Sequence, residues 1–475
     1  MKPKLAIFTK FCDELLPLEI HYLSGVLKRE DTQLNAIFEK ILREADKETR
    51  LYGFDERVDK RKYSFLKIHL SRLLEQADVD HFLTRIQYFD ARVQSDNITQ
   101  DDEKELMKMM ASISNRHYHF MRFFELMLHF RQYLLIRIRI QPYEEVNKWI
   151  ENYGNAYANS IERFKSLHQF TRHIIDEYTS QEVVTKEEEN ALLSIFDSEE
   201  LDGLTRYAAA VRLWFLFMNK GDYPSMKQLI AKASAMIVSN GYMGRRLLVN
   251  FYANCLLLHS KTGELDKARY YGYLSLKYPT NDYLFYVVNL SSVLRRQGKS
   301  QEAMDLMKQA FPVMRTTNDL YNKMGFVAHY VHCLVDLGKL KEASRFAENY
   351  LGSHLKEVMS TRWHLFFASY FRSLVLQEKF QRLIFVVNRY KLREKEFQYA
   401  RKPYYLPTMS WYIALAEFME GLISENNAIQ KMKNSAVLLV QDPLRKDRIL
   451  EQLEQLFQQQ PELIKKLKSE LFSTS

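Results

Sequence analysis

Four glycine-containing segments recur in the second half of the chain and constrain its fold more strongly than any other feature. They are NKGDYPSMKQLIAKA, KTGELDKARYYGYLS, RQGKSQEAMDLMKQA and DLGKLKEASRFAENY, with Gly221, Gly263, Gly298 and Gly338. Each glycine lies between stretches in which apolar residues recur at helical spacing, and the glycines are 42, 35 and 40 residues apart. Alanine follows three of them by five residues, at Ala268, Ala303 and Ala343. Glycine permits a tight turn between helices, and a small residue one turn later permits their close approach, so the pattern predicts an array of antiparallel helix pairs.

Glycine and proline are scarce throughout the chain. Its 475 residues include 14 glycines and 10 prolines, which is about 5% together, where roughly 12% is usual. Because these residues punctuate loops, their scarcity predicts long helices with few tight turns, and it argues against glycine-rich phosphate-binding loops and an open α/β sheet. Apolar residues recur at helical spacing almost everywhere, and only LIRIRI at 135–140 alternates like a strand. We therefore expect an all-α protein.

We expect three parts along the chain. The acidic segment TSQEVVTKEEEN is the best candidate for a linker, with its KEEEN run solvated, and it separates an N-terminal helical domain at 1–185 from helical repeats at 186–435. Residues 436–475 hold two helices that would begin at Pro443 and Pro461 and cap the array with a polar face. The N-terminal domain has the same helix-pair rhythm without the glycine and alanine signature. It is either a diverged part of the same array or a separate helical domain.

Cysteine usage and hydropathy indicate a cytoplasmic protein without a membrane partner. The three cysteines, Cys12, Cys255 and Cys333, are odd in number and far apart, so no disulfide framework is implied and a reducing compartment fits. Lysines begin the chain, but charged residues interrupt the first apolar segment before it reaches signal-peptide length. No window of about 18 uncharged apolar residues occurs, which argues against a transmembrane helix.

Charge is distributed unevenly along the chain. Residues 1–200 carry 29 lysines and arginines against 35 acidic residues, whereas residues 201–475 carry 39 against 24. The net charge of +9 thus combines a balance of −6 with a balance of +15. We expect the basic part to meet an acidic partner, which is a peptide, a nucleic acid or the protein's own N-terminal half, unless the excess reflects only lysine-rich helical surfaces.

No motif for catalysis or cofactor binding is present. The dinucleotide, P-loop, H-E-x-x-H and G-x-S-x-G signatures are absent, so we expect a protein that is not an enzyme and has no cofactor. The segment HYVHCLVD comes closest to a metal site, because His329, His332 and Asp336 share a helix face and Cys333 is adjacent. A structural zinc site normally needs four ligands, with partners from another element, so ordinary polar side chains are the interpretation that we favour.

The segment RHYHFMRFFELMLHFRQYLLIRIRI, 116–140, combines histidines, arginines and aromatic residues. On one continuous helix, His117 and His119 would lie about 200° apart and could not share a metal. The five arginines would project to different sides, which argues against a basic stripe and against a membrane span. The apolar residues form one broad face, which predicts a packed helix with arginines at its edges. That face consists of Phe120, Phe123, Phe124, Met127, Phe130, Leu134 and Ile138.

The repeated glycine–alanine segments resemble the tetratricopeptide repeat (TPR) superfamily over about residues 203–435. QEKFQRLIFVVNRY at 377–390 resembles a fifth unit, in which Glu378 stands where glycine is expected. The spacing departs from the 34-residue TPR period, and only Pro279 falls near the usual inter-repeat proline. The resemblance implies an α-solenoid, in which the first helix of each repeat lines a concave surface that binds an extended peptide or a helix.

The resemblance also implies a candidate binding surface. Its exposed groove positions lie ten, six, three and two residues before each turn glycine, and here they form a positively charged groove. The partner-binding residues that it implies are Lys261, Ser292, Arg295, Arg296, His332, Asp336 and Arg372. We therefore expect a non-enzymatic scaffold or adaptor that binds a protein or peptide partner, with arginines paired to an acidic or phosphorylated segment. The alternative is that these arginines form salt bridges between repeats.

A second basic cluster supports an alternative function. The segment NRYKLREKEFQYARKPYYLP at 388–407 interleaves basic and aromatic side chains, as single-stranded nucleic acid requires for phosphate neutralisation and stacking. Its candidate nucleic-acid-binding residues are Arg389, Lys391, Arg393, Tyr399, Arg401 and Lys402. The protein would then be a nucleic-acid-associated regulator that uses its basic C-terminal half. Because Glu394 and Glu396 lie among these residues, a partly solvated helix end with an aromatic inter-helix seam is the competing interpretation.

Overall fold

The chain is all-α wherever the structure describes it. The computed structural model describes residues 5–27, 31–180, 185–238, 243–400, 402, 405–437, 439–440, 443–457 and 460–472. Within these segments the regular secondary structure consists of twenty-five α-helices, which confirms the expected fold class. The chain divides into two compact units, Met1–Glu177 with Glu182–Leu258 and Tyr178–Gln181 with His259–Ser475.

The division between the units does not coincide with the linker proposed from the sequence. Helix α8 (Ile140–Ser180) ends and α9 (Lys186–Asp197) begins near residue 185, but both helices belong largely to the first unit. The change of unit instead falls within α12 (Arg245–Lys261), so a helix carries the chain from one unit into the next. The three-part division at the proposed linker stays a prediction.

Local chemistry sets several helix starts in the first unit. Before α8 its helices are α1 (Ala6–Glu14), α2 (Pro17–Val26), α3 (Thr32–Arg43), α4 (Lys60–Ala77), α5 (Val79–Gln94), α6 (Gln100–Ser112) and α7 (Phe120–Ile136). After α9 come α10 (Gly203–Lys220), α11 (Tyr223–Val238) and most of α12. Pro17 occupies the first turn of α2, where its missing N–H is not needed. The Asp78 carboxylate caps α5, because it accepts from the backbone N–H groups of Asp80 and His81.

Helix α7 forms much of the core of the first unit, as its apolar face predicts. Its most deeply buried side chains pack with side chains of α5, α6 and α8, and they include Phe120, Phe123, Met127, Phe130 and Leu134. The last arginines of the segment lie at the edge of this core in ion pairs. Arg137 is 2.9 Å from Asp96, and Arg139 is 3.0 Å from Glu103.

Helix α7 is shorter than the sequence predicts. It ends at Ile136, and Ile138 takes the left-handed conformation, with φ of 57°, and is 77% exposed. Ile138 is therefore not part of the apolar face, and the prediction that placed it there is wrong. His117 and His119 precede the helix in a turn, so their angular separation on a continuous helix does not apply. Burial lowers the pKa of His117 to about 3, and its neutral ring packs on Phe82 with ring centroids 4.2 Å apart.

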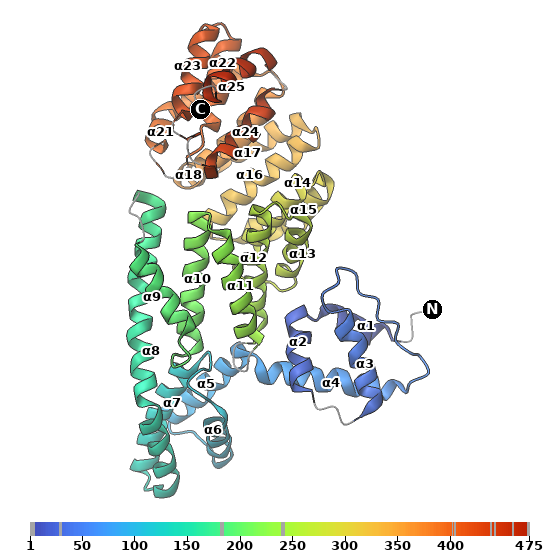
Figure 1. Ribbon diagram of the computed structural model, residues 1–475, viewed down its shortest axis with the longest axis vertical. Coiled ribbons are helices and arrows are strands. Elements are labelled where there is room, and N and C mark those ends of the chain that lie inside the picture. Colours follow the sequence, from blue (N-terminus) through green and yellow to red (C-terminus); the bar gives the residue numbers. More distant parts are fainter. Residues whose placement is uncertain are drawn as a thin grey trace. The chain divides into compact units, whose positions relative to one another are not determined.

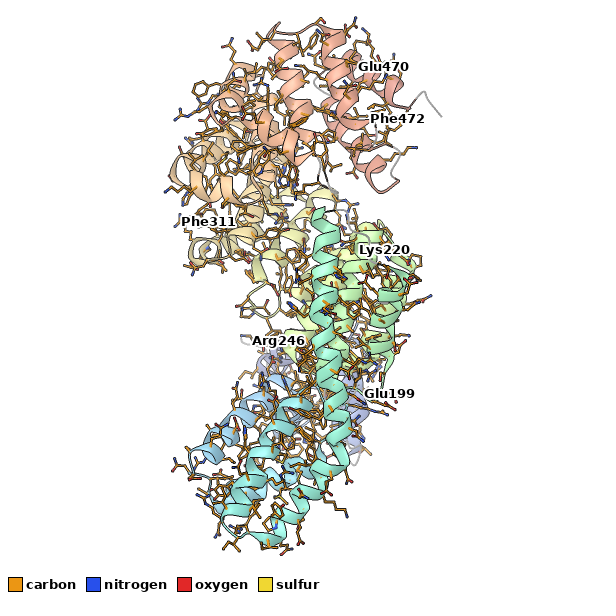
Figure 2. The ribbon with its side chains drawn as sticks, turned by 90° about the vertical axis from the view of Figure 1, so that its left-hand side faces the viewer. Glu199, Lys220, Arg246, Phe311, Glu470 and Phe472 are labelled. Atoms are coloured by element: carbon orange, nitrogen blue, oxygen red, sulfur yellow. The ribbon has the colours of Figure 1, made fainter. Side chains whose placement is uncertain are left out.

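The acidic run KEEEN is helical and includes the buried Glu189, so the prediction that the whole run is solvated is wrong. Thr185 caps α9: its hydroxyl accepts from the Glu188 N–H, while the Glu188 carboxylate accepts from the Thr185 N–H. The Glu189 carboxylate is buried and pairs with Lys220 of α10, with 2.9 Å between Oε2 and Nζ. Figure 2 shows Lys220 at one end of the packed α9–α10 pair and Glu199 toward the other. The run of like charges thus caps one helix and joins it to the next.

Successive helices of the second unit pack on one another in sequence order. They are α13 (Leu265–Ser275), α14 (Tyr283–Arg296), α15 (Ser300–Thr316), α16 (Leu320–Asp336), α17 (Leu340–Ser353), α18 (Leu355–Ser360), α19 (Trp363–Val375), α20 (Phe380–Arg389), α21 (Leu392–Tyr399), α22 (Thr408–Met419) and α23 (Glu425–Ala436). Helix α14 packs on α15 and α16, α16 packs on α17 and α19, and α19 packs on α20 and α22. Figure 1 shows these helices following one another from yellow to orange.

The turns between paired helices share one backbone conformation. The four repeat glycines all have φ between 69° and 79°, in the left-handed region. Glu378 takes the same conformation, with φ of 55°, at the position where a fifth turn glycine was expected. Gly421, with φ of 70°, makes a further such turn between α22 and α23 that we did not predict. The alanines after three of the glycines are buried, consistent with close helix packing: Ala268, Ala303 and Ala343.

Two helices follow the array and begin at prolines, as predicted. They are α24 (Pro443–Phe457) and α25 (Pro461–Phe472). Helix α25 packs on both α23 and α24, and Leu453 and Leu467 are buried there. Within the described ranges, no helix has the length and hydropathy needed to cross a membrane.

Candidate partner-binding site

Three helices of the second unit bring one acidic and two basic side chains together. Arg295 lies in the last turn of α14, Asp336 ends α16, and Arg372 lies in the last turn of α19. Because α14 packs on α16 and α16 packs on α19, these side chains meet although 41 and 36 residues separate them in the sequence.

Asp336 bridges the two arginines. Its Oδ2 accepts from Nε of Arg295 at 2.5 Å, and its Oδ1 accepts from Nη1 of Arg372 at 2.8 Å. The three side chains are only 16% to 20% exposed, so water screens their charges less than at an open surface. One carboxylate balances one of two guanidinium charges, which leaves the cluster with a net positive charge.

Both guanidinium groups have donors that the described contacts do not use. A guanidinium carries five N–H donors in a rigid fork, and the hydrogen bonds recorded in the described part of the chain engage only Nε of Arg295 and Nη1 of Arg372. Asp336 also fixes the orientation of both groups. A second carboxylate or a phosphate would therefore find donors already in position, and the arrangement suits an anionic ligand.

The bridged arginines line a cavity of about 650 Å³ within the second unit. Ser292, Arg296 and Ser300 extend its polar wall along α14 and α15. Nη1 of Arg296 donates to the carbonyl oxygen and the hydroxyl of Ser260 at 2.8 and 3.0 Å, so this arginine is oriented by α12. Five of the seven predicted partner-binding residues thus lie around one cavity, and their inter-helix contacts agree with the salt-bridge alternative as well.

The rest of the cavity lining includes both apolar and acidic residues. Val335, Val375 and Leu376 supply apolar surface, and Tyr412 supplies a hydroxyl. Helix α24 contributes further lining residues, which are Glu451, Glu454 and Leu456. We did not predict the contribution of α24. The spacing of Glu451 and Glu454 indicates that they share a helix face, but it does not indicate which part of the protein that face contacts. The volume is in the range of sites for small ligands or a few side chains.

His332 and His329 lie beside the arginines as neutral rings. Nδ1 of His332 is 3.5 Å from Nη1 of Arg372, and burial, followed by the nearby arginine charges, lowers its pKa well below 6.5. Burial also lowers the pKa of His329 to about 3, with smaller effects from Arg295 and Arg362. Neither ring adds charge to the cavity at neutral pH, so the positive charges that line it are those of the arginines.

The metal-like spacing of HYVHCLVD does not gather ligands around one point. The ring centroids of His329 and His332 are 6.1 Å apart, and Asp336 is engaged by two guanidinium groups. The Cys333 sulfur contacts the Ser291 hydroxyl at 3.4 Å. In the part of the chain that the structure describes, no group of three or more His, Cys, Asp and Glu side chains is placed to hold a metal ion.

Lys261 is separate from the other predicted partner-binding residues. It ends α12, is exposed, and does not line the cavity. The groove positions ten residues before the turn glycines are buried between helices, so the expectation that they are exposed is wrong. They are Ala253, Val288 and Ala328.

Two predicted nucleic-acid-binding residues make contacts within the protein. Nη2 of Arg393 donates to Oε1 of Glu417 at 2.7 Å. The Tyr399 hydroxyl is 2.7 Å from Nε2 of His364, and the two rings stack with centroids 4.0 Å apart. These contacts agree with the inter-helix seam that we weighed against nucleic-acid binding.

The other described members of that basic cluster have exposed side chains. The Arg389 guanidinium lies over the Phe385 ring, 5.9 Å from its centroid. Lys391 and Lys402 are exposed, and Arg401 lies outside the described residues. Nucleic-acid binding by this cluster stays a prediction.

Comparison of the chain with known proteins found no matching family model, no matching curated protein and no matching solved structure. The functional argument therefore rests on the chain's own residues. Among them, the Asp336-bridged arginines combine fixed geometry, excess positive charge and access to a cavity.

Proposed function

We propose that this protein is a non-enzymatic, TPR-like scaffold or adaptor that captures a carboxylate-bearing segment of a protein partner. The proposed binding site is the cavity lined by Arg295, Arg296 and Arg372. The observation that carries the proposal is the Asp336 bridge, which orients two guanidinium groups at the cavity wall and leaves donors unused. The packing of α14, α16 and α19 supports a TPR-like binding surface, because the first helices of such repeats line it.

The lining also favours a particular partner chemistry. The unused guanidinium donors of Arg295 and Arg372 favour an acidic side chain, and the apolar surface of Val335, Val375 and Leu376 favours an aliphatic side chain next to it. The three cysteines are free and buried, which supports a reducing, cytoplasmic setting for this encounter.

Fluorescence anisotropy with a fluorescein-labelled polyglutamate peptide tests the proposal. Arg372→Gln should weaken binding about tenfold or more, because a hydrogen bond between charged groups contributes roughly 1.5–3 kcal/mol. Lys308→Gln removes an exposed positive charge that does not line the cavity, so it is the matched control and should bind like the wild type. Equal affinity of Arg372→Gln and the wild type would contradict the proposal.

The nucleic-acid alternative predicts a different dependence. A polythymidine oligonucleotide would then bind with an affinity that falls steeply with salt and that requires Arg389 and Lys391 rather than Arg372. We place this reading second because Arg393 and Tyr399 are engaged in contacts within the protein.

A further inference from the structure

Helix α24 contributes lining residues to the cavity that the arginines also line. Glu451 and Glu454 line the same cavity as Arg295 and Arg372, and both glutamates are exposed. They are three residues apart, so they share one helix face. Figure 1 shows α24 beside the helices of the array. Helix α24 therefore brings carboxylates to the cavity, and the proposed partner would bring the same type of group.

The glutamates do not complete ion pairs with the arginines. The recorded partners of Arg295 and Arg372 in the described segments are Asp336 and His332. Glu451 and Glu454 line the same cavity without a recorded ion pair to these arginines in the described segments, so the attraction between them acts at a longer distance. A ligand whose carboxylates reach the unused donors would gain the short, charge-assisted hydrogen bonds that α24 does not make.

We propose that α24 is an internal, displaceable occupant of the partner-binding site, and that the partner is an acidic helix which takes its place. The inference rests on the proposed function, because it concerns the same cavity. The replacing helix would carry two carboxylates one turn apart, like Glu451 and Glu454, with an aliphatic side chain in the position of Leu456. Partner binding and release of α24 would then be one coupled event.

Helix α24 has a buried polar group without a hydrogen-bond partner, which favours its displacement. Leu453 and Leu456 are buried, which holds the helix in place. Directly before Leu453 in the sequence, Gln452 is only 6% exposed, and its Nε2 has no hydrogen-bond partner in the described part of the chain. A buried donor without a partner disfavours the seated helix, whereas water would satisfy the same amide after release.

Two variants of α24 in the full-length protein should change polyglutamate binding in opposite directions. Glu451→Gln/Glu454→Gln removes the facing charges and loosens α24, so affinity should rise about fivefold or more. Gln452→Leu replaces the unsatisfied amide by an apolar side chain of similar size and tightens α24, so affinity should fall about fivefold or more. Glu462→Gln removes an exposed charge on α25 outside the cavity and should change nothing.

The Gln452→Leu variant changes no charge. A change in its affinity for polyglutamate would therefore reflect displacement of α24 rather than altered electrostatic attraction. Hydrogen exchange gives a second readout: amides of residues 443–457 should exchange faster when polyglutamate binds the wild type, and less so in Gln452→Leu. Unchanged affinity of Gln452→Leu, or unchanged exchange on binding, would overturn the role of α24. If Arg372→Gln still weakens polyglutamate binding in that case, the proposed function stands and only the displacement mechanism falls.

Discussion

Asp336 determines the geometry of the candidate site at the scale of single residues. Asp336→Ala would leave two partly buried guanidinium groups without their shared carboxylate. We expect the free energy of unfolding to fall by about 2–3 kcal/mol. Asp336→Asn keeps a hydrogen-bond acceptor at the same place and should cost less. Urea denaturation of both variants measures the difference, and equal stability of Asp336→Ala and the wild type would show that the bridge is not structural.

Glu396 should make stability depend on pH. Its carboxyl is 6% exposed and accepts from the Ser410 hydroxyl at 3.2 Å, and burial raises its pKa from 4.5 to about 7. The folded state therefore holds a proton that the unfolded chain releases above pH 4.5. The stability contributed by this protonated carboxyl is complete below pH 4.5 and is lost as pH rises to about 7.

Glu396→Gln cannot ionise, so the variant should be more stable than the wild type at pH 8, by about 3 kcal/mol. Near pH 4 the two proteins should be similarly stable. Urea denaturation at both pH values measures this difference, with Glu394→Gln as an exposed neighbouring control. A stability difference that is the same at the two pH values would show that Glu396 is not the titrating group.

At the scale of elements, the turn between α7 and α8 has a residue poorly suited to its conformation. Ile138 is β-branched and takes φ of 57°, which costs about 1–2 kcal/mol for residues other than glycine. Because its side chain is exposed, Ile138→Gly should raise the free energy of unfolding by about 1 kcal/mol. Ile136→Gly, at an exposed helical position, should lower it by about 1 kcal/mol. Thermal unfolding of the pair tests whether the effect is specific to the left-handed turn.

Helix starts and turns were predictable wherever short-range chemistry determines them. Pro17 and Asp78 begin or cap α2 and α5 through contacts within one helical turn, and the structure confirms the helix starts predicted at Pro443 and Pro461. The helical KEEEN run and the early end of α7 were not predictable in this way. Glu189 is buried because Lys220 lies beside it, and that contact joins residues 31 positions apart.

The candidate site was predictable to the same limited extent. The resemblance to TPR repeats implied groove positions six, three and two residues before each turn, and these positions hold Arg372, Arg295 and Asp336. Helix α24 follows the repeats in the sequence and does not share their glycine spacing. Its Glu451 and Glu454 reach the cavity only because the chain returns to the array, which no local pattern encodes.

At the scale of the whole molecule, the two compact units each have buried apolar residues of their own. Met127 in the first unit and Leu374 in the second are fully buried, so alanine at either position would leave a cavity costing about 2–5 kcal/mol. Differential scanning calorimetry should resolve more than one transition. Met127→Ala should lower one transition temperature and Leu374→Ala another. Equal shifts of all transitions in both variants would mean that the chain unfolds as one cooperative body.

The burial of the cysteines has a practical consequence. Cys12, Cys255 and Cys333 are all buried, and burial raises the pKa of each thiol. They should therefore stay protonated and react slowly with maleimides at neutral pH. A single cysteine introduced at the exposed position of Glu454 would take a fluorophore selectively without removal of any native thiol. The natural sequence is thus already a suitable background for following α24 by site-specific labelling in real time.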